Sequence, residues 1–286
     1  MFGVDATLAA KRDRLLEIVR GYGSVAVAFS GGIDSTVVAK AARQALGEAA
    51  VAVTAASPSL ASGELELAGE LARLIGIRHR VIDTQEFGDP NYVRNAPNRC
   101  YFCKTELYSE LERLLPQLGV AVIANGANTD DTADWRPGME AASAHRVCSP
   151  LIEAGLGKAE VRRLAEHWGL PNWDKPATPC LSSRIAYGLE VTPERVRQID
   201  AAERFLHEQG FRELRVRYPH PDVARIEVPQ AELPRLVESQ LRLRLIEHFK
   251  SLGFKAITLD LEGFRSGSLN ELVSLDTKRL FQVEKP

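Results

Sequence analysis

The chain has 286 residues, of which 45% are hydrophobic and 26% are charged, and its formal net charge is −2. This ordinary globular composition excludes long disorder, and the lack of a basic excess argues against a nucleic-acid partner. The N-terminal residues interleave charged with apolar side chains, which excludes a signal peptide and a membrane span, so we expect a cytoplasmic protein.

The first part of the chain alternates helical and strand patterns. Apolar residues recur at helical spacing over residues 5–20, and a continuous apolar run over 24–29 is typical of a strand buried on both faces. The pattern then predicts a helix at 36–47, a strand at 50–56, a helix at 63–76, a strand at 79–84, a helix at 106–119 and a strand at 120–127. This alternation predicts the α/β class, with helices on both faces of a parallel sheet. Ligands of such sheets bind at the carboxyl ends of the strands.

The pattern changes between residues 185 and 190. A helix is predicted at 191–210, with Thr192 as its N-cap and Pro193 at the first helical position. After it we expect short strands at 213–219 and 223–228, one long helix at 232–253 and a strand at 255–263. We therefore expect two domains, residues 1–187 and 188–286, of which the second is smaller and α+β.

The loop after the first strand has the features of an anion site. It reads Ser30-Gly31-Gly32-Ile33-Asp34-Ser35. Its glycines let the backbone approach an anion, and the amides and dipole of the following helix favour negative charge. Asp34 would repel a phosphate unless it accepts backbone bonds or holds magnesium. The loop is not a Walker A motif, and no lysine is placed to reach the β and γ phosphates; a tight turn without a ligand is the alternative.

These six residues resemble the PP-loop of the adenine nucleotide α-hydrolase-like superfamily. The resemblance implies that ATP is cut between its α and β phosphates, so that pyrophosphate leaves and a substrate oxygen is adenylated. Members include NAD synthetase, the ATP-pyrophosphatase domain of GMP synthetase and tRNA thiolation enzymes. The motif alone leaves the acceptor of the adenylyl group open.

Three of the four cysteines suggest a joint role. Cys100 and Cys103 form a C-x-x-C pair on one small loop, and Cys180 lies in the segment 179–184. A structural zinc site normally needs four protein ligands, whereas three thiolates leave one iron of an iron–sulfur cluster open for chemistry. A redox dithiol and inert buried cysteines are the alternatives, and burial is our interpretation for Cys148.

Two groups of charged residues follow or occupy predicted strands. Asp130, Asp131 and Asp134 come after the strand at 120–127, where they could hold magnesium on the ATP or cap a solvated turn. In the second domain Arg215 and Arg217 face one side of a strand, and Arg225 would join them in a hairpin. Guanidinium groups suit phosphate, and a solvated sheet face is the alternative.

Several ordered blocks together resemble one family. They are AFSGGIDS, VTAASPS, NRCYFCK, GANTDDTADWRPG, PATPCLSSRIAYG, RVRYP with ARIEV, and GSLN, and they span residues 28–271. They are similar to the LarE family of ATP-dependent pyridinium-3,5-biscarboxylic acid mononucleotide sulfurtransferases, which work in assembly of the nickel-pincer nucleotide cofactor of lactate racemase. The resemblance implies that ATP, with Mg²⁺, adenylates a carboxylate of a pyridinium mononucleotide. A sulfur nucleophile then displaces AMP and gives a thiocarboxylate.

The family uses two sulfur sources. One type sacrifices the sulfur of a single cysteine and leaves dehydroalanine, and the other holds a 4Fe–4S cluster on three cysteines. With Cys100, Cys103 and Cys180 this chain resembles the cluster type. Cys180 also stands at the position of the sacrificial cysteine, so both chemistries stay open, and the sulfide donor is unknown.

The resemblance also implies roles for individual residues. The pyrophosphate loop is matched by Ser30, Gly31, Gly32, Asp34 and Ser35. Asp131 matches a carboxylate of the magnesium or ATP site, and Arg184 is placed to touch a phosphate. The family's substrate-phosphate and subunit-contact region is matched by Glu203, Arg215 and Arg217. A homo-oligomer, commonly a hexamer, is implied through the second domain.

Three other functions compete with this interpretation. A PP-loop tRNA thiolation enzyme with a three-cysteine iron–sulfur cluster would need a basic face to neutralise phosphates, which a net charge of −2 does not supply. An amide-forming ligase that uses ammonia would not need the cysteines. A non-catalytic nucleotide-binding protein would produce no AMP.

Overall fold

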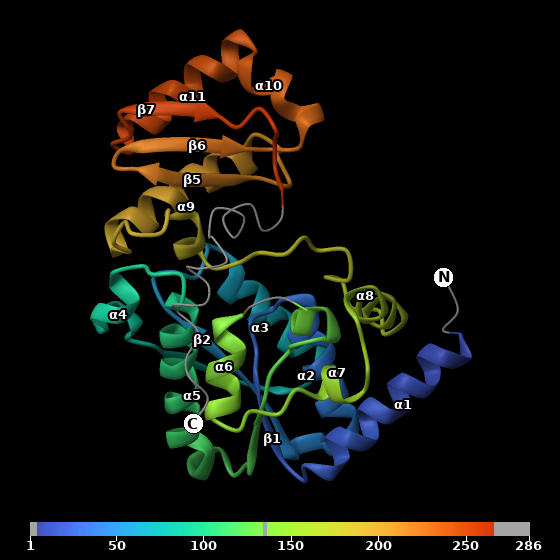
Figure 1. The fold of residues 1–286 in the computed structure, drawn as a ribbon. Helices are drawn as coiled ribbons and strands as arrows, with labels where there is room; N and C mark the ends of the chain where they lie inside the picture. Colours follow the sequence, from blue (N-terminus) through green and yellow to red (C-terminus); the bar gives the residue numbers. More distant parts are fainter. Residues whose placement is uncertain (1–4, 134–135, 266–286) are drawn as a thin grey trace. The chain divides into compact units, whose positions relative to one another are not determined.

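The chain forms two compact units, described by a computed structural model over residues 5–133 and 136–265 (Figure 1). Of the described residues, those in 5–57, 63–86 and 100–178 make up the first unit. Those in 58–62, 87–99 and 179–265 make up the second. Two short segments from the first half of the chain therefore belong to the second unit. None of the described helices is long and apolar enough to cross a membrane.

The first unit contains the predicted parallel sheet, so the α/β class is confirmed. Its strands are β1 (Val25–Ala28), β2 (Ala50–Ala56), β3 (Arg78–Asp83) and β4 (Val122–Ala124). They lie in the order β3-β2-β1-β4, and every neighbouring pair is parallel. β1 is one of the two inner strands of this sheet, and its carboxyl end leads into the phosphate loop.

Two apolar cores cover the two faces of this sheet, because successive side chains of a strand point to opposite faces. Val25 and Val27 belong to one core and Ala26 to the other. The first core is shared with α1 (Ala6–Gly21), α2 (Ile33–Leu46), α3 (Glu64–Ile75), α7 (Pro150–Glu153) and α8 (Lys158–His167). The second is shared with α5 (Arg99–Leu118) and α6 (Pro137–Ala144).

The second unit is built on a mixed three-stranded sheet. β5 (Arg215–His220) and β6 (Val223–Glu227) form the predicted antiparallel hairpin, and β7 (Ala256–Leu259) lies parallel to β6. Its helices are α4 (Pro90–Val93), α9 (Pro193–Glu208), α10 (Leu233–Val237) and α11 (Ser239–Ser251). Thr192 caps α9 as predicted, since its side chain accepts a hydrogen bond from the Arg195 amide at 3.3 Å.

Several predicted elements differ from the structure. The helix expected at 106–119 begins at Arg99, so the C-x-x-C pair lies in the first turn of α5 and not on a loop. The long helix expected at 232–253 is interrupted at Glu238, whose ψ of 133° is extended backbone. The strand expected at 120–127 is limited to Val122–Ala124. The helices between residues 137 and 167 were not predicted.

Candidate active site

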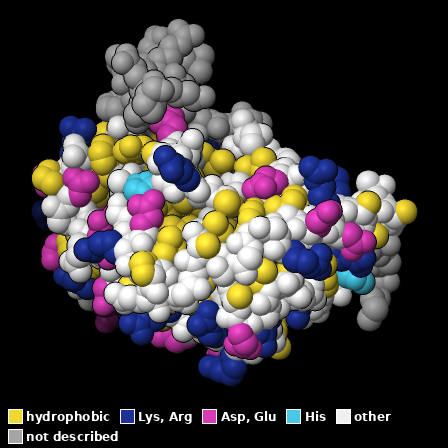
Figure 2. Space-filling model, turned by 90° about the horizontal axis from the view of Figure 1, so that it is seen from below, with side chains coloured by type: hydrophobic (Ala, Val, Ile, Leu, Met, Phe, Trp, Pro, Cys, Tyr) yellow, Lys and Arg dark blue, Asp and Glu magenta, His cyan; other side chains and the backbone are white. Residues whose placement is uncertain are grey.

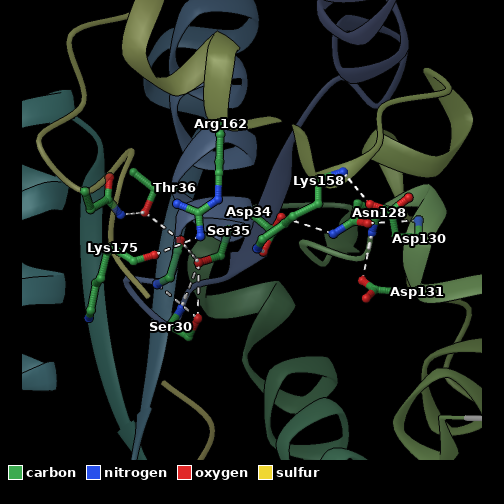
Figure 3. Close-up of polar contacts among 12 residues, drawn as sticks. Ser30, Asp34, Ser35, Thr36, Asn128, Asp130, Asp131, Lys158, Arg162 and Lys175 are labelled. Carbon is green, nitrogen blue, oxygen red and sulfur yellow. Dashed lines mark hydrogen bonds and ion pairs between the residues drawn. The ribbon is translucent and has the colours of Figure 1, made fainter. Parts of the chain in front are cut away.

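The phosphate loop is an ordered cradle between β1 and α2 (Figure 3). Gly31 has a φ of +70°, which favours glycine, and the N-cap Gly32 has no side chain to bond the first-turn amides of α2. Ser30 Oγ accepts from the Gly32 amide at 3.3 Å and lies 3.2 Å from Ser35 Oγ. Ser35 Oγ donates to the Gly32 carbonyl at 3.0 Å. The predicted loop residues thus surround a helix N-terminus, where an anion binds well.

Gly126 allows the loop after β4 to approach the backbone of α2. A Cβ at this position would lie 2.7 Å from the Ser35 nitrogen and 3.0 Å from the Asp34 carbonyl carbon. Such a distance to backbone is shorter than packed atoms tolerate, so only glycine fits without a shift of the loop. The segment 126–131 is therefore held directly beside the phosphate loop.

Asn172 supports the phosphate loop from behind, and the sequence did not predict this. Its Nδ2 donates to the Gly31 carbonyl and to Thr36 Oγ1, both at 3.0 Å, and Thr36 Oγ1 donates to the Gly32 carbonyl at 2.8 Å. The side chain is buried, and its Oδ1 has no hydrogen-bond partner in the part of the chain that the structure describes. A lone asparagine after a helix carries no sequence signal for this role.

Lys158, which the sequence analysis did not single out, reaches Asp34 of the phosphate loop. Its Nζ lies 2.5 Å from Asp34 Oδ2, and Asn128 Nδ2 donates to Asp34 Oδ1 at 3.1 Å (Figure 3). Asp34 is therefore neutralised by a cation and an amide at the mouth of the loop. Lys158 is the first residue of α8, and the apolar spacing of that helix is the signal that could have revealed it.

The start of α8 is fixed by carboxylates. Asp130 Oδ2 accepts from the Lys158 amide at 2.7 Å, and Glu160 Oε2 accepts from the Gly157 amide at 3.0 Å. Burial raises the pKa of Glu160, but Lys11, at 2.6 Å, and the Gly157 amide hold it below its ordinary value. These bonds set the position from which Lys158 extends to Asp34.

Asp131 stabilises its own loop. Its Oδ2 accepts from the Asn128 amide at 3.0 Å, and its Oδ1 lies 2.7 Å from an Arg136 nitrogen. The magnesium role of Asp131 stays a prediction, and Asp134 lies outside the described residues, as does the GSLN block. Within residues 5–133 and 136–265, no group of three or more His, Cys, Asp or Glu side chains is arranged to hold a metal ion.

The cysteines differ in exposure and in place. Cys100 is exposed and Cys103 partly exposed on one face of α5, and Cys180 is an exposed thiol of the second unit. Cys148 is partly buried, and burial raises the pKa of its thiol. Its backbone pairs with β4, since its amide donates to the Ile123 carbonyl at 2.9 Å. The reactive candidates are therefore the three thiols that were predicted to act together.

In the second unit, the loop that follows Cys180 is heavily hydrogen-bonded. The Arg184 guanidinium donates to the Pro179 carbonyl at 2.5 Å and the Cys180 carbonyl at 3.1 Å. The Leu181 amide donates to the Ser59 carbonyl at 2.8 Å. An exposed thiol thus sits on a backbone whose direction is fixed.

Buried arginines gather in the second unit where a phosphate group was predicted to bind. Arg184 forms a two-bond ion pair with Glu203, at 2.9 and 3.0 Å, and Arg217 lies 2.9 Å from Glu227. Arg215 stacks on the Phe264 ring at 5.0 Å. Glu203 also accepts from the Val216 amide at 2.9 Å, which ties the pair to β5. Arg215 and Arg217 are therefore not on a solvated sheet face.

Burial disfavours the charged form of these arginines. Desolvation and repulsion from Arg184 lower the pKa of Arg215 to about 10. Desolvation also lowers the pKa of Arg217, against the attraction of Glu227. Arg184 and Arg217 repel Arg215 within this buried cluster, while Glu203 and Glu227 attract it. A bound anion would relieve this repulsion.

Known proteins resemble both the loop and the whole chain. Residues 12–98, which include the phosphate loop, match the asparagine synthase family. An uncharacterized protein of Synechocystis sp. is 44% identical over 93% of this chain and 99% of its own length. The pyridinium-3,5-bisthiocarboxylic acid mononucleotide synthase of Lactiplantibacillus plantarum is 38% identical over 94% of this chain and 97% of its own length. A tRNA-specific 2-thiouridylase of Azorhizobium caulinodans is 29% identical over 53% of this chain and 48% of its own length.

Proposed function

Because the chain belongs to the LarE family of pyridinium-3,5-bisthiocarboxylic acid mononucleotide synthases, we propose that it adenylates a pyridinium carboxylate with ATP and then replaces the activated oxygen with sulfur. The family is one of sulfur transfer on a PP-loop fold. The phosphate loop at the N-terminus of α2 is the observation that supports ATP as the molecule bound there.

The adenylation step is the transfer of AMP to a carboxylate. A carboxylate oxygen of the substrate attacks the α phosphorus of ATP, the bond to the bridging oxygen breaks, and pyrophosphate leaves with both of its electrons. The amides of α2, Ser30 and Ser35 would hold the phosphates, and Lys158 would balance the charge that develops on pyrophosphate. Asp34 would no longer need Lys158 once a metal ion accompanies ATP.

The side chains at the loop suit Mg²⁺. Asp34 offers carboxylate oxygens beside the helix N-terminus, held there by Asn128 Nδ2, and hard oxygen ligands are those that Mg²⁺ takes. When bound, Mg²⁺ would neutralise part of the phosphate charge. Asp34 is the residue we propose to hold it, with Asp131 stabilising the loop that carries Asn128.

The sulfur step replaces AMP on the activated carbonyl. A sulfur nucleophile attacks the carbonyl carbon, the bond to the adenylyl oxygen breaks, and AMP leaves with the electron pair. If the nucleophile is the Cys180 thiolate, the product is a thioester. Loss of the Cys180 Cα proton and of the Cβ–S bond then releases the thiocarboxylate and leaves dehydroalanine. This route needs no external oxidant, because both electrons of the Cβ–S bond leave with sulfur.

A 4Fe–4S cluster is the other proposed source of sulfur. The donor set fits, because Cys100, Cys103 and Cys180 are soft thiol ligands and none is deeply buried. When bound, the cluster would supply an iron that is free to carry sulfide.

The arginine cluster is the proposed site for the phosphate of the mononucleotide. The mutual repulsion of its guanidiniums and the lowered pKa values of Arg215 and Arg217 are what an anion would compensate. Arg184, held by Glu203, would add a third guanidinium. We extend the proposal to the nickel-pincer nucleotide cofactor of lactate racemase as the final product, and to a homo-oligomer, commonly a hexamer in the family, formed through the second unit.

A single-turnover assay tests the proposal. The full chain, purified and reconstituted anaerobically with iron and sulfide, is mixed with Mg–ATP and pyridinium-3,5-biscarboxylic acid mononucleotide, and pyrophosphate and thiocarboxylate are quantified. We expect both products from the native chain, pyrophosphate alone from Cys180→Ser, and both from the matched control Cys148→Ser. Substrate-dependent pyrophosphate without any thiocarboxylate from the native chain would refute sulfur transfer.

The same samples distinguish the two sulfur sources. Visible absorption typical of an iron–sulfur cluster that disappears in Cys100→Ser supports the cluster. A chain that loses the mass of one H₂S at Cys180 after turnover supports the sacrificial route. Both outcomes agree with the proposed overall reaction, and they differ only in the source of the sulfur atom that is transferred.

Thiolation of tRNA is the alternative to be excluded. It is supported by the 2-thiouridylase relative and the three cysteines. Against it, the face in Figure 2 shows Lys and Arg interspersed with Asp and Glu and not gathered in a basic patch. Pyrophosphate release that depends on tRNA and not on the pyridinium mononucleotide would favour the alternative.

A further inference from the structure

Asn95 has an unusual backbone conformation in the second unit. Its φ is 54°, in the left-handed region, and its side chain is 0% exposed. Asparagine tolerates this region better than most residues, but the conformation is still uncommon and persists only where the surroundings fix it. The fold therefore holds the Asn95 backbone in one conformation, and this fixes the orientation of its side chain.

The Asn95 amide holds the chain that follows Cys180. Nδ2 donates to the Ala186 and Leu189 carbonyls, both at 2.9 Å, and lies 3.3 Å from the Ile185 carbonyl. The backbone carbonyl of Asn95 accepts from the Gly188 amide at 3.1 Å. One buried side chain thus donates to several carbonyls of the loop that follows Cys180.

Arg99 continues the same network toward Cys180. Its Nη1 donates to Asn95 Oδ1 at 2.5 Å and to the Ser182 carbonyl at 2.9 Å. Ser182 Oγ lies 2.7 Å from the Tyr92 hydroxyl. Ser182 is two residues after Cys180, so the bonds end next to the thiol-bearing residue. All of these groups are buried, where hydrogen bonds are strong and their loss is costly.

We propose that Asn95 and Arg99 are positioning residues for sulfur transfer, which act by holding the backbone that presents Cys180. The inference rests on the proposed function for its chemistry and on these hydrogen bonds for its geometry. An exposed thiol receives its direction only from its backbone, and a displacement of about 1 Å can cost about 100-fold in rate. The binding of ATP has no such dependence, because the phosphate loop belongs to the other unit.

Three variants of the full chain test the proposal. Asn95→Gly keeps the left-handed backbone and removes only the amide. Arg99→Lys keeps the charge and one donor. Arg197→Gln is the matched control, because it removes an arginine of the same unit whose ion pair with Glu194 is on the surface. We expect thiocarboxylate per pyrophosphate to fall more than tenfold in Asn95→Gly, to fall less in Arg99→Lys and to be unchanged in Arg197→Gln. The KM for ATP should stay the same in all three.

Hydrogen exchange gives a second readout that does not depend on activity. The Ser183 and Ile185 amides donate to the Cys180 and Ser182 carbonyls, at 2.9 and 3.2 Å. We expect them to exchange more than tenfold faster in Asn95→Gly and at the native rate in Arg197→Gln. Unchanged exchange in a folded Asn95→Gly overturns the proposal, as does an unchanged product ratio.

The proposed function and the positioning role of Asn95 and Arg99 can be refuted separately. If the native chain releases no pyrophosphate with any substrate, the proposed function fails, and hydrogen exchange still decides whether Asn95 holds the loop. If Asn95→Gly does not fold, Arg99→Lys decides the matter. A loss of sulfur transfer in Arg99→Lys with pyrophosphate release intact supports the positioning role, and equal loss of both steps refutes it.

Discussion

A methyl group at Gly126 is the smallest change that tests the phosphate loop. In Gly126→Ala the new Cβ would lie 2.7 Å from the Ser35 nitrogen and 3.0 Å from two further backbone atoms of Asp34 and Ser35. All three contacts are with backbone, so no side-chain rotation relieves them. The loop after β4 and the first turn of α2 must separate by several tenths of an ångström. Overpacking of this kind costs about 1–3 kcal/mol in the free energy of unfolding.

The separation should also weaken ATP binding, because it displaces the amides that face the phosphates. We expect the KM for ATP in pyrophosphate release to rise about tenfold, which corresponds to about 1.4 kcal/mol. Urea unfolding gives the stability change, and the initial rate of pyrophosphate release at varied ATP gives the KM.

Gly69→Ala is the matched control for this experiment. Gly69 lies inside α3, and nothing is within 4 Å of the position that its Cβ would take. The same substitution should there raise the free energy of unfolding by about 0.5–1 kcal/mol, since alanine favours a helix over glycine. If Gly126→Ala and Gly69→Ala change stability by the same amount and with the same sign, the close approach at the phosphate loop is refuted.

Four further predictions concern single side chains. Lys158→Met should lower kcat for pyrophosphate release about 100-fold, measured by stopped-flow pyrophosphate detection, because a charge that stabilises the leaving group is lost. It should change the free energy of unfolding in urea by less than about 1 kcal/mol, because the lost pair with Asp34 is partly exposed. Asn172→Leu should lower the free energy of unfolding by about 1–3 kcal/mol in urea, because a buried carbonyl loses its donor. Burial lowers the pKa of His79 below 6.5, so the unfolded chain takes up a proton at a higher pH than the folded chain does. The stability should therefore fall as the pH drops below about 6.5. In thermal unfolding, His79→Gln should remove that part of the pH dependence. The affinity of the arginine cluster for inorganic phosphate should fall as the pH rises above about 10, the pKa of Arg215 without a ligand; calorimetric titrations at several pH values check this, and Arg215→Met should abolish that dependence.

The sheet could be predicted from the sequence because its strands are buried on both faces. The runs that contain Val25–Ala28 and Ala50–Ala56 are almost wholly apolar, and each is followed by a helical pattern with a glycine at its end. The phosphate loop was visible for the same reason, since two adjacent glycines between a strand and a helix are a local signal. The hairpin of β5 and β6 followed from alternation around a short turn.

The helix boundaries that were missed have weaker local signals. The start of α5 at Arg99 is preceded by Asn98, a residue type that caps helices, but asparagine and proline recur throughout the segment before it, so this signal does not stand out. The interruption at Glu238 occurs without a glycine or a proline at that position. In both places packing in the folded chain decides the backbone, and propensity alone does not.

The contacts that complete the candidate site are invisible in the sequence for another reason. Lys158 and Asp34 are 124 residues apart, and Asn172 is 141 residues from Gly31. Nothing within a local window links these pairs, because the parallel sheet brings their loops to one edge only after folding. A lysine or an asparagine by itself is most often a surface residue, so its role depends on where the fold places it.

The two candidate anion sites handle charge in different ways, and this suits the order of the proposed reaction. At the phosphate loop the Lys158 and Asp34 charges cancel, so attraction for a phosphate comes mainly from the amides and dipole at the start of α2. A site of this kind can bind the phosphates of ATP and still release pyrophosphate. In the arginine cluster the guanidiniums of Arg184, Arg215 and Arg217 repel one another in a buried place, where charge is poorly screened. A mononucleotide phosphate held there would stay bound while pyrophosphate and then AMP leave, which is what two successive steps on one substrate require.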